Sequence, residues 1–416
     1  MIRGDARCRS DAWSRGGGWF GAAAGMFAVA WGSNQFVSLL VAYKSDRGIS
    51  TAVNDGLFGI YALALIVALL LCGPAADLWG RAWIVRAAVA VSLVATVLLM
   101  AGTNSTPLLF AGRFVAGAAS GAIFAAGTAW VKELSAGTEG SGARRAALAL
   151  SLGFGLGPLV AGIVAQWAPH PLVLAYLPHL VITTIALPLA WRVPETLRPT
   201  AAGVGYVARL RVPAAGHRRF VRVVLPAAPW VFAAPSIAFA ILPSLVSGHV
   251  GGYPLLFSAV IAALTLGTGV AIQPLARRLD HPGQVTGALL GLAVIVVGTL
   301  VGAAAADRAA PVLVVIAAVP LGAGYGLGLV SGLLETQRIA GPDELAGLTA
   351  VYYSLTYVGF ALPLALAWLH DVASYDVMLV VVAAVGAASA LMVWRGSSRT
   401  AGHSGRLRSE SAAEVR

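Results

Sequence analysis

Twelve runs of about 20 mostly apolar residues fill almost the whole chain, and each is bounded by Gly, Pro or a charged residue. A helix needs about 20 such residues to cross the hydrocarbon core of a bilayer. Only 11% of the residues are charged, whereas soluble domains carry about 25%. The pattern predicts an all-α membrane protein with twelve transmembrane helices. They are expected at residues 18–42, 53–72, 83–102, 108–131, 146–167, 172–192, 223–246, 254–275, 284–305, 310–333, 346–369 and 374–395.

The basic residues alternate between loops. Of the 28 Lys and Arg residues, 24 lie in the two terminal segments and around the loops that follow even-numbered runs. The opposite loops hold only Lys44, Arg47 and Arg308. By the positive-inside rule, both termini are expected in the cytoplasm, and this orientation requires an even number of spans. A nucleic-acid surface would instead gather basic and aromatic residues on one soluble face, so the net charge of +11 indicates topology and attraction to anionic lipid.

The two halves of the chain repeat a short charged motif. Asp77 and Gly80 follow the second run with the spacing Asp-x-x-Gly, and Asp280 and Gly283 follow the eighth run with the same spacing. Glu133 and Glu335 end the fourth and tenth runs at nearly the same offset. The repeat predicts two pseudo-symmetric six-helix bundles. The expected organisation is a cytoplasmic tail at 1–17, bundles at 18–192 and 223–395, an Arg-rich cytoplasmic linker at 193–222, and a second tail at 396–416.

The loop after the second run has the residues of a conformational switch. Gly73 and Gly80 allow two helices to meet closely. Asp77 can accept hydrogen bonds from a helix N-terminus across the two halves, and Arg81 can form a bidentate pair with Glu133. Such contacts would stabilise one conformational state over another. The alternative is a tight turn with arginines that only set the topology.

The segment "GPAADLWGRAWIVR" resembles the signature of the major facilitator superfamily between helices 2 and 3, and the resemblance extends over all twelve spans. It is carried by Gly73, Asp77, Gly80 and Arg81. Leu78 and Ala82 stand where the family usually has basic residues. The resemblance implies alternating access around a central cavity, lined by the first helix of each three-helix repeat. Within the family, the chain resembles the twelve-span drug or metabolite:proton antiporters.

Two further segments resemble signatures of the same family. "GRFVAGAASG" is similar to the span 4 signature of many proton-coupled members, and "LGFGLGPLVAG" to the span 5 signature of exporters, with Ala161 in place of one glycine. The matching residues are Arg113, Gly117 and Gly121 in the first, and Gly153, Gly157, Pro158 and Gly162 in the second. The resemblance implies an exporter in which span 5 seals against span 8. Small residues also allow close helix packing in lipid, and an importer or facilitator of a small solute such as a sugar is the alternative.

Three ionisable residues within the spans are candidates for coupling to protons. A charged side chain in the middle of a span costs about 2.5–3.5 kcal/mol, so Arg113 is expected to face the bundle interior, where it can bind an anionic group or tune a proton carrier. The alternative is that Arg113 caps carbonyls or reaches the surface. No Asp or Glu lies near the middle of a run, which leaves Asp55 and His179 as candidate carriers for proton antiport. Each also suits a structural role.

Polar and aromatic residues in three spans define a candidate substrate cavity. Unsatisfied amides are costly in the hydrocarbon core, so they are expected to contact substrate, water or each other. The candidates are Asn34 and Gln35 in span 1, Trp230, Phe232 and Ser236 in span 7, and Tyr325 in span 10. Aromatic rings with a few amides and one Arg suit an amphipathic organic molecule, such as a drug or a metabolite.

Other classes of protein lack support in the sequence. A primary pump would need a phosphate loop, and an intramembrane enzyme paired carboxylates, a zinc-spaced His set or a Ser-His constellation; the sequence has none of these. We therefore expect no catalytic residue, metal or cofactor. The expected partners are a small-molecule substrate, protons and lipid, with a monomer as the working form; a non-transporting receptor is less well supported. The 26 Arg against two Lys indicate a GC-rich, bacterial genome, and hence the plasma (inner) membrane.

Overall fold

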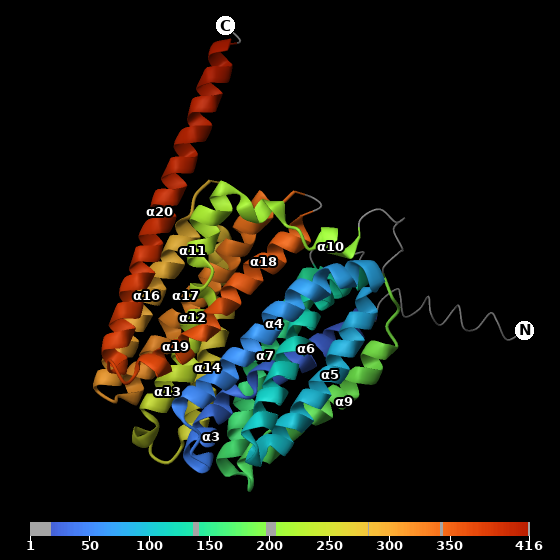
Figure 1. Cartoon of the computed structure of the whole chain (residues 1–416), viewed down its shortest axis with the longest axis vertical. Helices are drawn as coiled ribbons and strands as arrows, with labels where there is room; N and C mark the ends of the chain where they lie inside the picture. The colour runs from blue at the N-terminus through green and yellow to red at the C-terminus, as the bar shows by residue number, and fades with distance from the viewer. Residues whose placement is uncertain (1–17, 136–140, 197–204, 282, 342–343, 415–416) are drawn as a thin grey trace, which may run out of the picture. The chain divides into compact units, whose positions relative to one another are not determined.

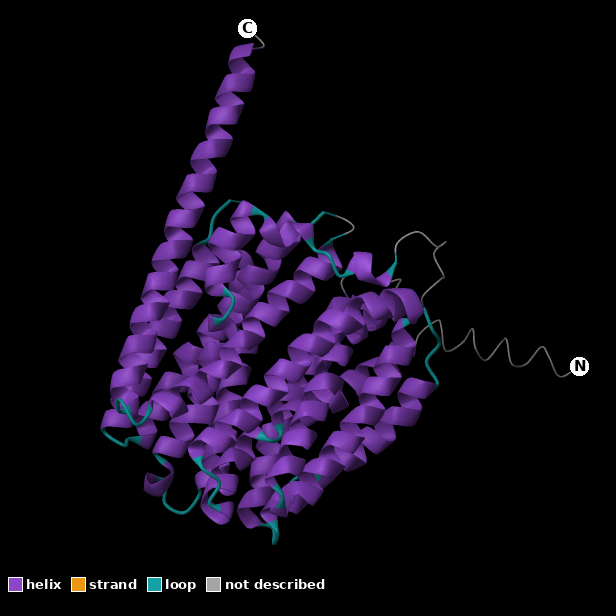
Figure 2. Cartoon of the chain, in the orientation of Figure 1, coloured by secondary structure: helices purple, strands orange, loops and turns teal. Residues whose placement is uncertain are grey.

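The computed structural model describes residues 18–135, 141–196, 205–281, 283–341 and 344–414. Every regular element in these ranges is helical (Figure 2). Twelve of the helical segments there are long and apolar enough to cross a membrane. The predicted all-α class with twelve spans is confirmed.

The chain divides into two compact units. Unit 1 comprises Met1–Arg211 and Val250–Leu266, and unit 2 comprises Val212–His249 and Gly267–Arg416. The division falls inside helix α14 (Pro254–Ala271), the predicted eighth span. This span is thus shared, whereas the repeat in the sequence places all of it in the second bundle.

Unit 1 contains the first six spans (Figure 1). Its elements are α2 (Gly18–Asn34), the 3₁₀ helix η1 (Val37–Leu39), α3 (Leu40–Arg47), α4 (Thr51–Trp79), α5 (Arg81–Ala101), η2 (Gly102–Asn104), α6 (Thr106–Leu134), α7 (Ser141–Trp167), α8 (Pro171–Leu174), α9 (Leu177–Trp191) and α10 (Tyr206–Arg209), with the first part of α14.

Unit 2 contains the remaining spans except the first part of span 8. Its elements are η3 (Pro213–Gly216), the π-helix η4 (Phe220–Val224), α11 (Leu225–Ala227), α12 (Trp230–Ser236), the π-helix η5 (Ile237–Ile241), α13 (Leu242–Leu245), η6 (Ser247–His249), α15 (Gln273–Arg278), α16 (Thr286–Asp307), α17 (Pro311–Ile339), α18 (Leu345–Tyr357), η7 (Val358–Ala361), α19 (Leu362–Leu369) and α20 (Tyr375–Glu414). Helix α20 continues the last span well beyond the predicted end at residue 395.

The first span of each half is the most buried. In span 1, 89% of the apolar window is buried, and in span 7 the share is 78%, whereas each other span has at most half of its window buried. Helix α2 packs against α5, α6, α7 and α9 and is apolar on all sides, as expected for a helix without a lipid-facing surface. The two halves therefore place the same element at the centre of each bundle.

Helix α4 extends further than the sequence indicates. It runs through Gly73 and Pro74 to Trp79, so the predicted loop between spans 2 and 3 consists of Gly80 alone. An added Cβ at Gly73 would meet nothing within 4 Å, so Gly73 does not bring two helices together as predicted. Gly80 has φ +110°, a conformation that L side chains rarely adopt, and makes the turn into α5.

Candidate functional site

The switch residues of unit 1 meet where α4 turns into α5. The Arg81 guanidinium lies 3.1 Å from the Asp77 carboxylate and forms an ion pair with Glu133 at the end of α6. The predicted Arg81–Glu133 pair is present. Arg81 thus bridges two carboxylates on different helices. The hydrogen bonds predicted between Asp77 and the other half stay a prediction.

The segment that follows α9 completes this cluster, although no pattern in the sequence predicted it. The Glu195 carboxylate accepts a hydrogen bond from the Ala82 amide at the start of α5 (2.9 Å) and occupies the space beside Gly80. Thr196 donates to Glu133 at 2.5 Å. Arg86 donates to the Val193 carbonyl at 2.6 Å. The start of the linker is therefore tied to the turn that carries Asp77 and Arg81.

Unit 2 repeats the arrangement with a different arginine. Arg338, near the end of α17, forms ion pairs with Asp280 and, at 3.4 Å, with Glu335, and Arg219 also pairs with Glu335. Gly283 has φ +86°, in parallel with Gly80 in unit 1. The repeat in the sequence therefore corresponds to two acid–arginine–acid bridges. The bridging Arg comes from α5 in unit 1 and from α17 in unit 2.

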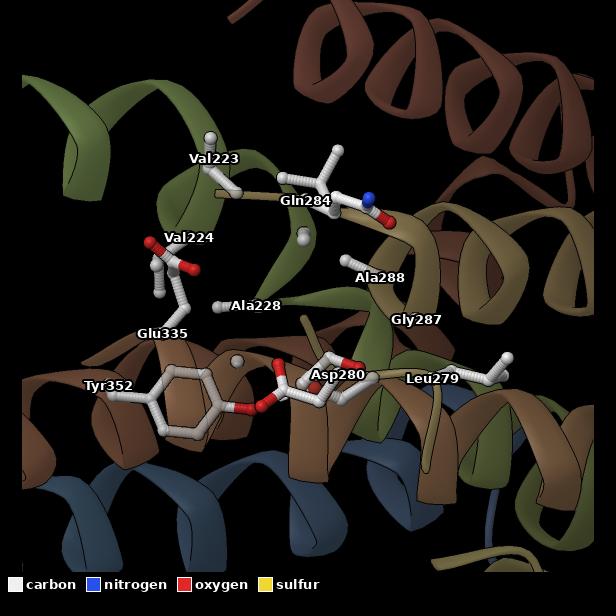
Figure 3. Close-up of a pocket in the computed structure, with 15 residues that line it drawn as sticks. Val223, Val224, Ala228, Leu279, Asp280, Gln284, Gly287, Ala288, Glu335 and Tyr352 are labelled. Carbon is white, nitrogen blue, oxygen red and sulfur yellow. Dashed lines mark hydrogen bonds between the residues drawn. The ribbon is translucent and has the colours of Figure 1, made fainter. Parts of the chain in front are cut away.

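A narrow pocket lies beside the bridge in unit 2. Figure 3 shows Asp280, Glu335 and Tyr352 around it, together with Gln284 and aliphatic side chains from the start of span 7. Its enclosed volume of about 20 Å³ has room for roughly one water molecule. The pocket is therefore too small to hold an organic substrate.

Span 1 is broken where the sequence places Asn34 and Gln35. Helix α2 ends at Asn34, and the chain passes through a turn and η1 before α3 begins. Asn34 is 8% exposed and Gln35 is fully buried, and the Gln35 side-chain oxygen has no partner among the described groups. Irregular backbone at membrane depth is tolerated only where protein or a cavity surrounds it. The break therefore places inside unit 1 two amide side chains, with one amide oxygen unpartnered among the described residues.

Arg113 supports the break from α6. Its side chain is fully buried, and it donates hydrogen bonds to the carbonyls of Ser33 (3.4 Å) and Leu57 (3.1 Å). The guanidinium carbon lies 4.6 Å from the ring centre of Phe36 and 4.2 Å from that of Tyr61. These contacts fit the alternative in which Arg113 caps carbonyls, and none of the ion pairs among the described residues includes it. Arg113 thus links the end of α2, next to the break, to the backbone of α4.

His179 lies in a hydrogen-bonded chain that crosses three spans. Its Nε2 is 3.1 Å from the Ala28 carbonyl, and because a carbonyl only accepts, this nitrogen carries the hydrogen. Nδ1 can then accept from Thr96 (2.7 Å), which in turn accepts from the Gln35 amide at 3.5 Å. Ser92 and Thr183 also lie within 3.3 Å of Nε2. The chain connects His179 to the break in span 1.

Asp55 differs from His179 in having no such partners. It is 6% exposed, and no hydrogen bond or ion pair among the described residues involves its carboxylate. The side-chain amide of the preceding Asn54 donates to the Leu40 carbonyl at 2.9 Å, which joins this part of α4 to α3. Asp55 and His179 are thus both buried in unit 1, with contrasting surroundings.

The glycines of the span 4 and span 5 motifs make close helix contacts. Added Cβ atoms at Gly117 and Gly121 would strike the Tyr61 and Leu65 carbonyls of α4. In α7, those at Gly153 and Gly157 would approach the carbonyls of Phe27 and Trp31 in α2 at 2.5 Å.

Farther along α7, the contacts change partner. Gly162 faces Ala259 of α14, and the carbonyl of Pro158 accepts a hydrogen bond from Ser38 at 2.7 Å. Span 5 therefore packs closely on α2 and on α14 at successive turns. This agrees with the contact between spans 5 and 8 that the family resemblance implies.

The candidate cavity residues of unit 2 separate into two groups. Phe232 lies 5.6 Å from Tyr325 and stacks on Tyr357 at 4.4 Å, and Phe360 joins the same aromatic cluster. Trp230 instead donates to Ser389 of α20 at 3.0 Å. Ser236 donates to the carbonyl of Ala233 within its own helix at 2.8 Å and lies 3.5 Å from that of Gly359. The structure thus brings Phe232 and Tyr325 together and adds Tyr357, which was not among the cavity candidates.

The chain has twelve apolar helices in two units, each with an ionic bridge, and a buried span that is broken. These features are typical of a multi-pass membrane transporter. The family model of the Major Facilitator Superfamily matches residues 21–362, and the chain belongs to this family. It is therefore a secondary transporter of a small solute and not an enzyme. No curated protein sequence gives a significant match.

Solved structures of transporters share the fold. The crystal structure of the nucleoside transporter NupG has a TM-score of 0.71 at 11% identity, covering 91% of this chain and 99% of that chain. A POT family transporter in complex with 5-aminolevulinic acid has a TM-score of 0.73 at 11% identity, covering 92% and 96%. A POT family transporter in complex with a thioalcohol-conjugated peptide has a TM-score of 0.73 at 12% identity, with the same coverage. At these identities, the comparison shows the fold alone.

Proposed function

We propose that the protein exports a small amphipathic organic molecule, a drug or a metabolite, in exchange for protons. The observation that supports export is the packing of span 5. Gly153 and Gly157 let α7 lie directly on the backbone of α2, and Gly162 brings its other end against α14. A close-packed span 5 can seal one side of the transport pathway, as in the exporters whose signature this segment resembles.

The substrate class rests on the side chains inside the spans. The cluster of Phe232, Tyr325 and Tyr357 offers aromatic surface, and the break in span 1 offers the amides of Asn34 and Gln35. Aromatic rings with a few polar groups are typical of sites for small organic ligands. We assign these residues to substrate binding and the bridges around Asp77 and Asp280 to switching between states.

We propose Asp55 as the proton carrier in preference to His179. An exchangeable proton needs a group that is free to gain and lose it, and Asp55 is buried without a hydrogen-bond or ion-pair partner among the described residues. His179 is already held by Thr96 and the Ala28 carbonyl in its neutral form. One proton moving across about 100 mV supplies roughly 2.3 kcal/mol, enough for an approximately fifty-fold substrate gradient.

Accumulation of a lipophilic cationic dye in expressing cells tests the proposal. We expect lower accumulation with the wild type than with an empty vector, and loss of this difference with a protonophore or with Asp77→Asn. Asp307→Asn, at an exposed carboxylate at the end of α16, is the matched control and should leave export intact. Asp55→Asn should remove the response to the protonophore, whereas His179→Gln should retain it.

The same experiment separates export from import. Unchanged accumulation with wild-type protein at normal abundance would exclude broad dye efflux. Higher accumulation that Asp77→Asn abolishes would instead favour an importer or facilitator. A protonophore response that survives Asp55→Asn would refute the assignment of the carrier.

A further inference from the structure

Helix α14 begins without a capping residue of its own. The first amides of a helix have no acceptor within the helix and usually take one from a Ser, Thr, Asp or Asn side chain just before it. Here the residues before and at the helix start are Val250, Gly251, Gly252, Tyr253 and Pro254, none of which can supply such a side chain. The first amides of α14 therefore need an acceptor from elsewhere.

Gln166, near the end of α7, supplies this acceptor. Its Oε1 accepts hydrogen bonds from the amides of Leu255 and Leu256, both at 3.2 Å. Its Nε2 donates to the carbonyl of Gly252 at 3.1 Å. One side chain of span 5 thus satisfies three backbone groups at the start of span 8. All of these residues belong to unit 1.

The surrounding contacts make this end of α7 and α14 a tight seam. Gly162, one turn before Gln166, faces the backbone of Leu255 and the side chain of Ala259. The ring of Trp167 lies 6.4 Å from that of Tyr253. Ser38 is fully buried and lies beside Gly162. Separation of the two helices would expose Ser38 and leave the amides of Leu255 and Leu256 without their acceptor.

We propose that Gln166 is a positioning residue that latches α14 onto α7, so that the transport cycle must break its three hydrogen bonds to open this seam. Because Gln166 of span 5 caps the start of span 8, the first turn of α14 keeps its acceptor only while the seam is closed. The inference rests on the proposed function only in that an exporter has to open a seal between spans 5 and 8. Its test can be made without any substrate.

The test measures how fast N-ethylmaleimide modifies a thiol introduced by Ser38→Cys in purified full-length protein in detergent. Cys72, half-buried on α4, is the internal reference in the same sample, and peptide mass spectrometry follows both thiols. We expect Gln166→Leu to accelerate modification of the introduced thiol about tenfold relative to Cys72, which corresponds to about 1.4 kcal/mol in favour of opening.

Two further variants show whether hydrogen bonding is responsible. Gln166→Glu keeps acceptor oxygens for Leu255 and Leu256 but loses the donor to Gly252, so its rate should lie between the wild type and Gln166→Leu. Gln273→Leu, at a partly buried glutamine at the start of α15, is the matched control and should behave as the wild type. An unchanged rate with Gln166→Leu would overturn the latch. Equal acceleration at Cys72 would also overturn it, because Gln166 would then support the whole fold.

Because the readout is thiol modification, its outcome is independent of dye export. Export failure with a latch that behaves as expected would refute the proposed function alone. Normal export with an unchanged rate in Gln166→Leu would refute the latch alone.

Discussion

Arg113 is a buried positive charge that backbone carbonyls and aromatic rings hold in place. A lysine at this position would keep the charge but lose the planar group that contacts Phe36 and Tyr61 and the fork that reaches two carbonyls. Because hydrogen bonds to charged groups contribute about 1.5–3 kcal/mol each, we expect Arg113→Lys to lower the free energy of unfolding by about 2–4 kcal/mol. Thermal unfolding of purified protein, followed by tryptophan fluorescence, measures this.

Arg308→Lys is the control for that substitution, since Arg308 is exposed at the end of α16. It should leave the melting temperature unchanged. A melting temperature of Arg113→Lys equal to that of the wild type would mean that the break in span 1 does not depend on the guanidinium.

The Glu133 carboxylate forms an ion pair with Arg81 and accepts a hydrogen bond from Thr196, so it connects α5, α6 and the start of the linker. Glu133→Gln removes the charge but keeps the size. Because the cluster is partly exposed, the effect on folding should be small, at most about 1 kcal/mol. We expect transport to fall at least fivefold at normal membrane abundance, as measured by dye export and immunoblotting. Loss of protein in parallel with activity would assign Glu133 to folding instead.

The predictable part of the site consists of residues whose positions repeat or match a motif. The pairing of Arg81 with Glu133 followed from helix ends that meet at one face of the bundle. Glu195, Arg219 and Arg338 could not be identified, because a single charged residue in an Arg-rich region has no spacing that distinguishes a partner from a solvated residue. Their roles depend on tertiary contacts.

Among the elements, span 5 gives the sharpest test of close packing. Gly157→Leu would force side-chain atoms against the Trp31 carbonyl, only 2.5 Å from an added Cβ, whereas a Cβ at Gly155 would meet nothing within 4 Å. We expect Gly157→Leu to abolish export or to make the protein leak protons, and Gly155→Leu to retain export. Dye efflux and proton leak in inverted vesicles measure both. Equal activity of the two variants would show that this contact does not limit the cycle.

The course of the helices could be predicted only in part. Hydropathy located all twelve spans, because apolar length alone decides which segments can cross a bilayer. It did not locate the end of α4, since Gly73 and Pro74 indicate a loop yet lie within the helix. The sequence also did not predict the break after Asn34, where the contacting Arg113 comes from another helix, 80 residues away from Ser33.

At the scale of the whole molecule, the two units form the same arrangement of charges with different residues. Each joins an Asp-x-x-Gly turn to a Glu at the end of a long helix through an arginine, and in each the first span is the most buried. The bridging arginine differs, so the repeat conserves the charge arrangement and not the residue that provides it. Arg81 and Arg338 are therefore equivalent in charge, and we expect both to take part in switching.

The distribution of charge also predicts how the molecule lies in the membrane. Lys44, Arg47 and Arg308 are the only basic residues in the loops opposite the termini, so the positive-inside rule places Arg308 outside and Arg278 in the cytoplasm. In a background with Cys8→Ser and Cys72→Ala, a membrane-impermeant maleimide should label Arg308→Cys in intact cells and Arg278→Cys only after permeabilisation. Both positions are exposed in the structure, so access depends on the side of the membrane. The reverse labelling pattern would invert the orientation and, with it, the side that the contact between α7 and α14 closes.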